Sequence, residues 1–187
     1  LNQSEFLLSF PCIKPSQNKL IKDIEIEVNS SEYNKILDQI HLAYKKAPYY
    51  SEFMPIVENI FNPNIKSIAD LAAKSVVAIS EYLELQVQFK YSSVDFKETK
   101  GLDKADRLIE ITKSLNSNNY INAIGGLDLY GKTYFGERDV KLEFLEPCLN
   151  EYPQFHKDFT SGLSIIDVIM FNGKNKTNQL LSNYSLV

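Results

Sequence analysis

The sequence predicts an α/β fold with a mainly parallel sheet, flanking helices and a helix-rich N-terminal half. Strand-like and helix-like segments alternate from residue 85 onward, an order that is typical of βαβ units and a parallel sheet. Before residue 85, apolar side chains recur mostly at helical spacing. The chain has 187 residues, of which 44% are hydrophobic, and a chain of this length can bury a core of its own. We therefore expect residues 1–187 to form a single α/β domain.

The N-terminal half is expected to begin with two strands and to continue with three helices. Residues 6–10 form a short apolar run before Pro11. Residues 21–28 alternate apolar and acidic side chains, with the period of two that a half-buried strand shows. Polar residues that favour helix starts then precede runs with helical spacing. The first helix is expected from the caps at residues 29–31 to Tyr44, and the others over residues 51–61 and 67–83.

The C-terminal half is expected to supply the parallel sheet. Each expected strand is a short run of alternating apolar residues that ends at serine, glycine or proline. The strands are expected over residues 85–91, 119–124 and 141–145. The helices are expected over residues 103–115, 164–171 and 174–181, with a short helix or turn over 127–135. Ligands of such sheets bind outside the carboxyl ends of the strands, so these ends are the first places to look for a site.

Composition and charge exclude several classes of protein. Lys and Arg total 20 against 24 for Asp and Glu, a net charge of −4, whereas proteins that bind nucleic acid cluster positive charge. We therefore expect no nucleic-acid partner. No signal peptide or long apolar stretch is present, so no membrane insertion is expected. The cysteines, Cys12 and Cys148, are too far apart for a metal knuckle, which favours a reduced, cytoplasmic protein.

The two histidines do not form a metal site. Neither His41 nor His156 has a second ligand at metal-site spacing, so no metal is expected. His41 lies among apolar helical positions, where a packed structural role is the simpler interpretation. His156 follows a Pro153–Phe155 turn and is either a general base or a solvated loop residue.

Two small-residue pairs mark the expected strand ends. Ser92 and Ser93 follow the strand over 85–91, and Gly125 and Gly126 follow the strand over 119–124. Glycines at such a place either let the backbone approach a ligand closely or form a turn. The pair does not have the spacing of a dinucleotide-binding or P-loop motif.

Arg107 is one of only two arginines in the chain. Its guanidinium can clamp a phosphate or carboxylate with two parallel hydrogen bonds. The competing interpretation is a surface pair with Glu110, three residues further along the helix.

Asp167 also has two interpretations. Ser164 and Asp167 are either a nucleophile with a carboxylate, or the capping box of the helix that follows.

Several segments together resemble one family of bacterial proteins, the WbqC-like family. Their order and spacing resemble that family's pattern over most of residues 5–182. The segments are Lys45–Tyr50, Ser92–Ser93 with Asp106–Ile111, Asn119–Tyr130, Tyr152–Phe155 and Leu163–Asp167. The family's usual SGPGG is replaced by residues 122–126, which keep only the final glycine pair. This sequence lacks the family's N-terminal HQPxYLPWxGYF stretch. The resemblance therefore implies that residues 1–187 are the larger, C-terminal part of a longer protein.

The resemblance implies a function in bacterial surface-polysaccharide gene clusters, O-antigen clusters included. We expect a tailoring enzyme, a transferase that moves an acyl or aminoacyl group onto a nucleotide-linked amino sugar, with no cofactor or oligomeric state indicated. His156 or Asp167 is expected to carry the proton. The residues expected to bind the small-molecule substrate are Arg107, Gly125, Gly126, Ser92, Ser93, Tyr130 and Gln154.

Two other functions remain open. The first is an ATP-dependent enzyme that resembles nucleotidyl transferases, an analogy at the level of the fold only. The second is a non-catalytic scaffold or binding module of a glycan-assembly complex, for which Tyr49, Tyr50 and Phe53 are the surface candidates.

Overall fold

The computed structural model describes residues 5–187 and divides the chain into two compact units. Unit 1 comprises Leu1–Val87 and Asn150–Leu180, and unit 2 comprises Gln88–Leu149 and Leu181–Val187. Each unit buries its own hydrophobic cluster. The single domain expected for residues 1–187 stays a prediction, and each unit is described here by itself.

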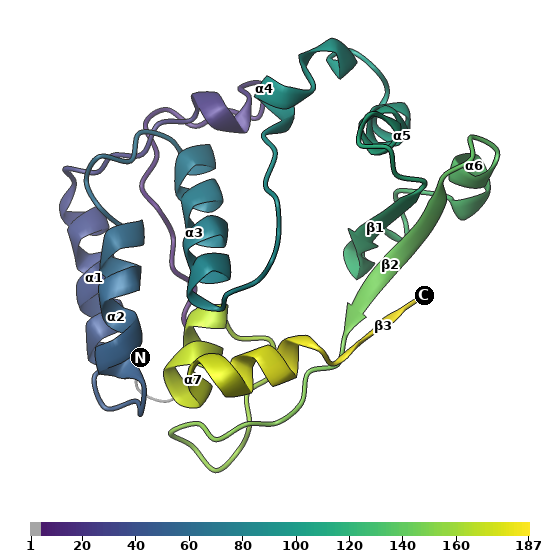
Figure 1. The fold of residues 1–187 in the computed structure, drawn as a ribbon. Helices are drawn as coiled ribbons and strands as arrows, with labels where there is room; N and C mark the ends of the chain where they lie inside the picture. The colour runs from purple at the N-terminus through teal and green to yellow at the C-terminus, as the bar shows by residue number, and fades with distance from the viewer. Residues whose placement is uncertain (1–4) are drawn as a thin grey trace. The chain divides into compact units, whose positions relative to one another are not determined.

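Unit 1 is helical, as the spacing of its apolar residues predicts. Helices α1, α2 and α3 pack side by side (Figure 1). Their bounds are Ser31–Tyr44, Tyr50–Ile60 and Ile68–Tyr82. Side-chain caps fix two of the helix starts, because the Ser30 and Ser67 hydroxyls accept hydrogen bonds from the third residue along. The three predicted helices are confirmed, with ends shifted by a few residues.

Helix α7, Ile165–Leu181, completes unit 1 and is broken at Gly173. This glycine has φ 63° and ψ −174°, a conformation that is essentially closed to other residues. The two helices predicted over 164–171 and 174–181 are therefore present on either side of the break.

The core of unit 1 gathers where α2 and α7 contribute their apolar residues. Phe53, Val57, Ile169 and Met170 are all fully buried. Phe53 is therefore not the surface aromatic that the scaffold hypothesis requires. Its helical spacing already places it on the apolar face of α2.

The two strands expected at the N-terminus do not form. Residues 6–10 form no bridge to any described residue, and residues 21–28 make only two isolated bridges, Ile26 opposite Cys12 and Glu25 opposite Ser67. Within 21–28, the first three residues fold as the 3₁₀ turn η1, Ile21–Asp23. Alternation alone does not make a strand, because a strand also needs a neighbour along its length.

Unit 2 holds the three-stranded sheet of the described chain, with short helices around it. Helix α5 contacts β1 and helix α6 contacts β2 (Figure 1). The strands are β1, Asn119–Ala123, β2, Lys141–Pro147, and β3, Tyr184–Leu186. The helices are α4, Ser92–Asp95, α5, Lys104–Ser114, and α6, Lys132–Gly136, with 3₁₀ turns η2, Lys97–Thr99, and η3, Ile124–Gly126.

The sheet is small and is not mainly parallel, so this part of the fold prediction is wrong. The strand order is β1-β2-β3. Strand β1 pairs with β2 in parallel, with Asn119 opposite Lys141, whereas β3 pairs with β2 antiparallel, with Leu145 opposite Leu186. The chain is a mixed α/β protein with a helix-rich N-terminal half. The helical part of the prediction is confirmed.

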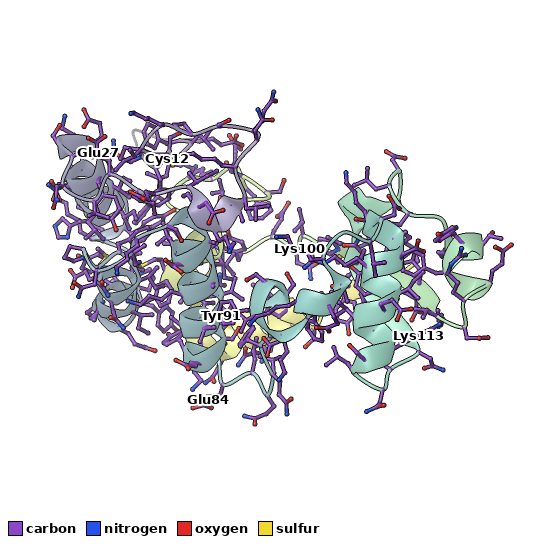
Figure 2. The ribbon with its side chains drawn as sticks, turned by 90° about the horizontal axis from the view of Figure 1, so that it is seen from above. Cys12, Glu27, Glu84, Tyr91, Lys100 and Lys113 are labelled. Carbon is purple, nitrogen blue, oxygen red and sulfur yellow. The ribbon has the colours of Figure 1, made fainter. Side chains whose placement is uncertain are left out.

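The segment over 85–91 was expected to be a strand of the sheet, but it is not one. It forms no strand and pairs with no other strand among residues 5–187. Its alternating apolar side chains Leu85, Val87, Phe89 and Tyr91 are 40–52% exposed. Tyr91, just before α4, is labelled in Figure 2. A strand-like pattern without a neighbouring strand leaves an exposed extended segment.

Helix α5 and strand β2 supply the core of unit 2. Ile109 packs with Phe135, Val140, Leu142 and Phe144, all of which are buried. Among the described residues, no helix is long and apolar enough to cross a membrane.

Candidate functional site

Asp167 lies at the centre of a buried polar cluster in unit 1. It occupies the first turn of α7 and is only 5% exposed. The Tyr44 hydroxyl donates to its Oδ2 at 3.0 Å, and the Tyr152 hydroxyl donates to its Oδ1 at 2.8 Å. The Gln154 amide also donates to Oδ1, at 3.3 Å. We call Asp167, Tyr44, Tyr152 and Gln154 the carboxylate–tyrosine cluster.

Three elements position this cluster. Tyr44 is the last residue of α1, and Asp167 lies in the first turn of α7. Gln154 is held in the loop before α7 by Thr160, since its Nε2 donates to the Thr160 carbonyl at 3.0 Å and its Oε1 accepts from the Thr160 N–H at 2.9 Å. This paired hydrogen bond fixes the amide so that it also reaches Asp167.

The side chain of Asp167 does not close a capping box. Ser164 accepts a hydrogen bond at its carbonyl from the Asp167 N–H and at its hydroxyl from the Ile166 N–H. The Asp167 carboxylate instead bonds the two tyrosines and Gln154. The sequence motif marks the helix start correctly, but the carboxylate has different partners from those a capping box would give it.

Burial and the neighbouring charge act on the two phenols. Burial raises the pKa of Tyr44 well above its usual range, and the adjacent Asp167 carboxylate raises it further. Burial likewise raises the pKa of Tyr152, and its hydrogen bond to Asp167 adds to the effect. Both phenols therefore keep their protons and act as hydrogen-bond donors to the carboxylate at neutral pH.

His156 lies apart from this cluster in its contacts. Its side chain is exposed in the loop before α7, and it makes no hydrogen bond or ion pair within the described part of the chain. Its role as a proton carrier stays a prediction, without a partner that would orient its ring.

The Arg107 side chain stabilises a turn in unit 2 through two hydrogen bonds. From α5, its Nε donates to the Thr99 hydroxyl at 3.1 Å and its Nη2 donates to the Ser92 carbonyl at 3.2 Å. Thr99 is itself buried and donates to the Phe96 carbonyl at 2.8 Å. No ion pair joins Arg107 to Glu110 among residues 5–187, so the surface-pair interpretation is wrong.

This hydrogen bond joins two predicted site residues, Arg107 and Ser92, that are 15 positions apart. Ser92 and Ser93 do not end a strand, as the sequence had suggested, but begin the short helix α4. The Ser92 backbone carbonyl, rather than its hydroxyl, meets Arg107. The Ser93 side chain is exposed.

The glycine pair follows β1, as predicted, and forms the turn η3. Gly126 is buried, and a Cβ added to it would lie 2.5 Å from Asn122 Nδ2 and 3.3 Å from Phe144 Cε1. A Cβ on Gly125 would meet nothing within 4 Å. Gly126 therefore allows close packing inside the unit, and Gly125 is the one of the pair that is open on its Cβ side.

Tyr130 belongs to the core of unit 2. Its ring packs edge-on against Phe135, with centroids 6.1 Å apart. Gly126 accepts a hydrogen bond from the Tyr130 N–H at 3.1 Å. Tyr130 thus anchors the turn after β1, and its predicted contact with substrate stays a prediction.

Other features of the described residues do not add a site. A surface cavity of about 590 Å³ in unit 2 is lined by Lys132, Lys141, Glu143 and neighbouring residues, none of which the sequence had singled out. Within residues 5–187, no group of three or more His, Cys, Asp or Glu side chains could hold a metal ion.

Sequence reasoning missed Tyr44, Tyr152 and Thr99. Tyr44 has the spacing of a core residue of α1, and only its terminal hydroxyl turns to Asp167, which is 123 positions away. Thr99 has no motif around it. Tyr152 lies in the segment Tyr152–Phe155 that carries the family resemblance, but nothing in that segment indicates a contact with Asp167.

A family model describes nearly the whole chain. The model of the WbqC-like protein family matches residues 1–179. Neither the search of curated proteins nor the search of solved structures found a match. Because the family model covers far more than half of the sequence, the chain belongs to the WbqC-like protein family.

Proposed function

We propose that this protein is a transferase that acts on a nucleotide-linked amino sugar in bacterial surface-polysaccharide (O-antigen) biosynthesis, in the cytoplasm. Membership of the WbqC-like family suggests a role connected with polysaccharide gene clusters. In the proposed reaction, the sugar amine attacks the carbonyl carbon of an activated acyl or aminoacyl donor, a thioester or an ester. A C–N bond forms, the C–S or C–O bond breaks, and the thiol or alcohol leaves with the electron pair and a proton.

The Arg107 contact carries this proposal. A guanidinium has five N–H donors, of which the Thr99 and Ser92 bonds use two. The remaining donors belong to a side chain whose direction is already fixed, so little entropy is lost when an anion binds. A phosphate of a sugar nucleotide is a ligand with the charge and oxygens that such a group prefers. Ser93 and the open side of Gly125 belong to the same unit, and we propose both as further substrate contacts.

The proton of the attacking amine needs an acceptor. Of the two predicted carriers, Asp167 has a defined set of donors that fix its orientation, whereas His156 has no hydrogen-bond partner in the described part of the chain. Taking unit 1 by itself, we propose Asp167 as its proton-accepting group, with Gln154 as the positioning residue.

Uridine diphosphate is the probe for the phosphate contact. In calorimetric titrations of the full chain, Arg107→Ala is expected to weaken binding of this nucleotide at least tenfold, because a charge-assisted bidentate contact is lost. Arg107→Lys should recover only part of the affinity, since lysine cannot form the fork.

Arg138→Ala is the matched control for this titration. Arg138 is the other arginine of the chain and lies over the Tyr134 ring beside Asp106. The Arg138→Ala variant should bind uridine diphosphate as the wild type does. No heat of binding in the wild type, or equal affinity in the Arg107→Ala variant, would contradict the proposed function. Retained binding of ATP alone with release of pyrophosphate would favour the nucleotidyl-transfer alternative instead.

A further inference from the structure

Asp167 is the only buried carboxylate among residues 5–187, and it has no cationic partner there. Every other buried polar residue that the structure describes is a serine, threonine or asparagine. The ion pairs of the described residues do not include Asp167. A buried charge is normally paired with an opposite charge, because removing it from water is costly. Three neutral donors reduce this cost without cancelling the charge.

One acceptor position of the carboxylate remains open. An ionised carboxylate offers about four lone-pair sites. Within residues 5–187, Oδ1 accepts from Tyr152 and Gln154, and Oδ2 accepts from Tyr44 only. The open position on Oδ2 can therefore take one further N–H or O–H donor. A donor that brings a positive charge would supply the counter-charge that the cluster lacks.

Further aromatic rings pack against the two tyrosines of the cluster. The Tyr44 ring meets Phe171 edge-on, and Phe171 in turn meets Phe155, with centroids 4.7 Å apart. The Tyr152 ring packs edge-on against Phe159. Ring faces carry partial negative charge and attract ammonium groups. Phe155 is 49% exposed, so these rings extend from the buried carboxylate to the surface of unit 1.

We propose that the carboxylate–tyrosine cluster is a binding site for a primary ammonium group. The ammonium would donate to Asp167 Oδ2 and lie against the Tyr44–Phe171 ring pair. The hydrogen bonds between Gln154 and Thr160 hold the shape of the loop before α7, and a movement of this loop would admit the ligand. The inference rests on the proposed function only for the molecule that carries the amine, an amino sugar. The site itself follows from the residues of unit 1.

Two sugars that differ only at the nitrogen test this site. D-Glucosamine carries an ammonium at neutral pH, whereas N-acetyl-D-glucosamine carries a neutral amide. In ¹⁵N-resolved NMR titrations of the full chain, glucosamine is expected to shift the amide signals of Asp167, Gln154 and Thr160 in a saturable way. N-acetylglucosamine should leave them in place. Equal effects of the two sugars, or no effect of glucosamine, would overturn the proposal.

Variants of the two tyrosine-bonded aspartates give the second arm. Asp167→Asn removes the charge and should weaken glucosamine binding at least tenfold. Asp106→Asn is the matched control, because Asp106 also accepts from a tyrosine, Tyr134 at 2.6 Å, but is half-exposed and paired with Arg138. The Asp106→Asn variant should bind glucosamine as the wild type does. Unchanged affinity in a folded Asp167→Asn chain would refute the site.

Two further results separate a failure of the ammonium site from a folding defect and from a failure of the proposed function. If Asp167→Asn does not fold, Tyr44→Phe takes its place: it keeps the carboxylate and frees another acceptor position, so it should bind glucosamine at least as tightly. Weaker binding by this variant would count against the site. A chain that binds glucosamine but not uridine diphosphate keeps the ammonium site and loses the proposed function, and the reverse pattern removes only the ammonium site.

Discussion

Replacing Gly173 by alanine is expected to lower the free energy of unfolding by about 3 kcal/mol, which combines about 1–3 kcal/mol of backbone strain with a similar cost of overpacking. Gly173 breaks α7 with φ 63° and ψ −174°. An added Cβ would lie 2.6 Å from Tyr49 Cδ1 and 2.7 Å from Tyr49 Cζ. The backbone of Tyr49 is held in place, because its N–H donates to the Met170 carbonyl of α7 at 3.0 Å, so the ring must rotate about its own side-chain bonds to make room. At roughly 2–4 °C per kcal/mol for a chain of this size, thermal unfolding should show a fall of about 9 °C.

Gly162→Ala separates the two causes. Gly162 also has a positive φ, 71°, but a Cβ there would meet nothing within 4 Å. This variant should therefore lose only the backbone contribution, about 1 kcal/mol. Equal losses in both variants would show that the Tyr49 ring yields, and a Gly173→Ala chain as stable as the wild type would contradict the described break in α7.

Raising the pH above about 10 is expected to destabilise the protein steeply. Burial, with the charge of Asp167, raises the pKa of Tyr44 above its ordinary value of 10.0. The folded chain then holds this proton at a pH where the unfolded chain releases it. The contribution of this group to the free energy of unfolding is therefore fully present below about pH 10 and is lost as the pH rises further. The limiting slope is about 1.4 kcal/mol per pH unit for one such group. Tyr152 adds an effect of the same sign, because burial and its hydrogen bond to Asp167 also raise its pKa.

Tyr44→Phe is the variant that tests this pH dependence. Denaturant unfolding followed from pH 7 to 12 should give a shallower alkaline slope for Tyr44→Phe than for the wild type. Some slope should remain, because burial and the hydrogen bond to Glu52 also raise the pKa of Tyr82. Parallel pH profiles for the two chains would show that the Tyr44 phenol is not held against Asp167.

The helices could be predicted from the sequence because their signals are local. A serine three residues before its partner N–H and apolar residues at a spacing of three and four mark the starts and faces of α1 and α3. Even the break at Gly173 lies between two helices that the pattern had separated. Each of these signals lies within a few residues of the structure that it determines.

The sheet could not be predicted in the same way, because pairing depends on distant segments. The run over 85–91 has the alternation of a strand, but no ladder partner within residues 5–187. In contrast, β3 was not predicted at all: its three residues pair with β2 near the end of the chain, nearly 40 positions after their partners. Local periodicity cannot distinguish a paired strand from an exposed extended segment.

The candidate site was predicted in part for the same reason. Asp167 and Arg107 stood out as chemical groups, but their motifs could not name their partners. The Tyr44 hydroxyl comes from 123 positions away, and Ser92 contributes a backbone carbonyl, which any residue carries. The packing of Gly126 against Asn122 likewise depends on the fold, so the glycine pair appeared as a ligand loop when one of its members is a packing residue.

A transfer assay on UDP-glucosamine tests the central claim most directly. The full chain is incubated with this sugar nucleotide and, in turn, with an acyl thioester and an aminoacyl ester, and the products are identified by mass spectrometry. The proposed function predicts an amide on the sugar nitrogen with one of the two donor classes, and its loss in the Arg107→Ala variant. UDP-glucosamine that stays unmodified with both donor classes would contradict the account.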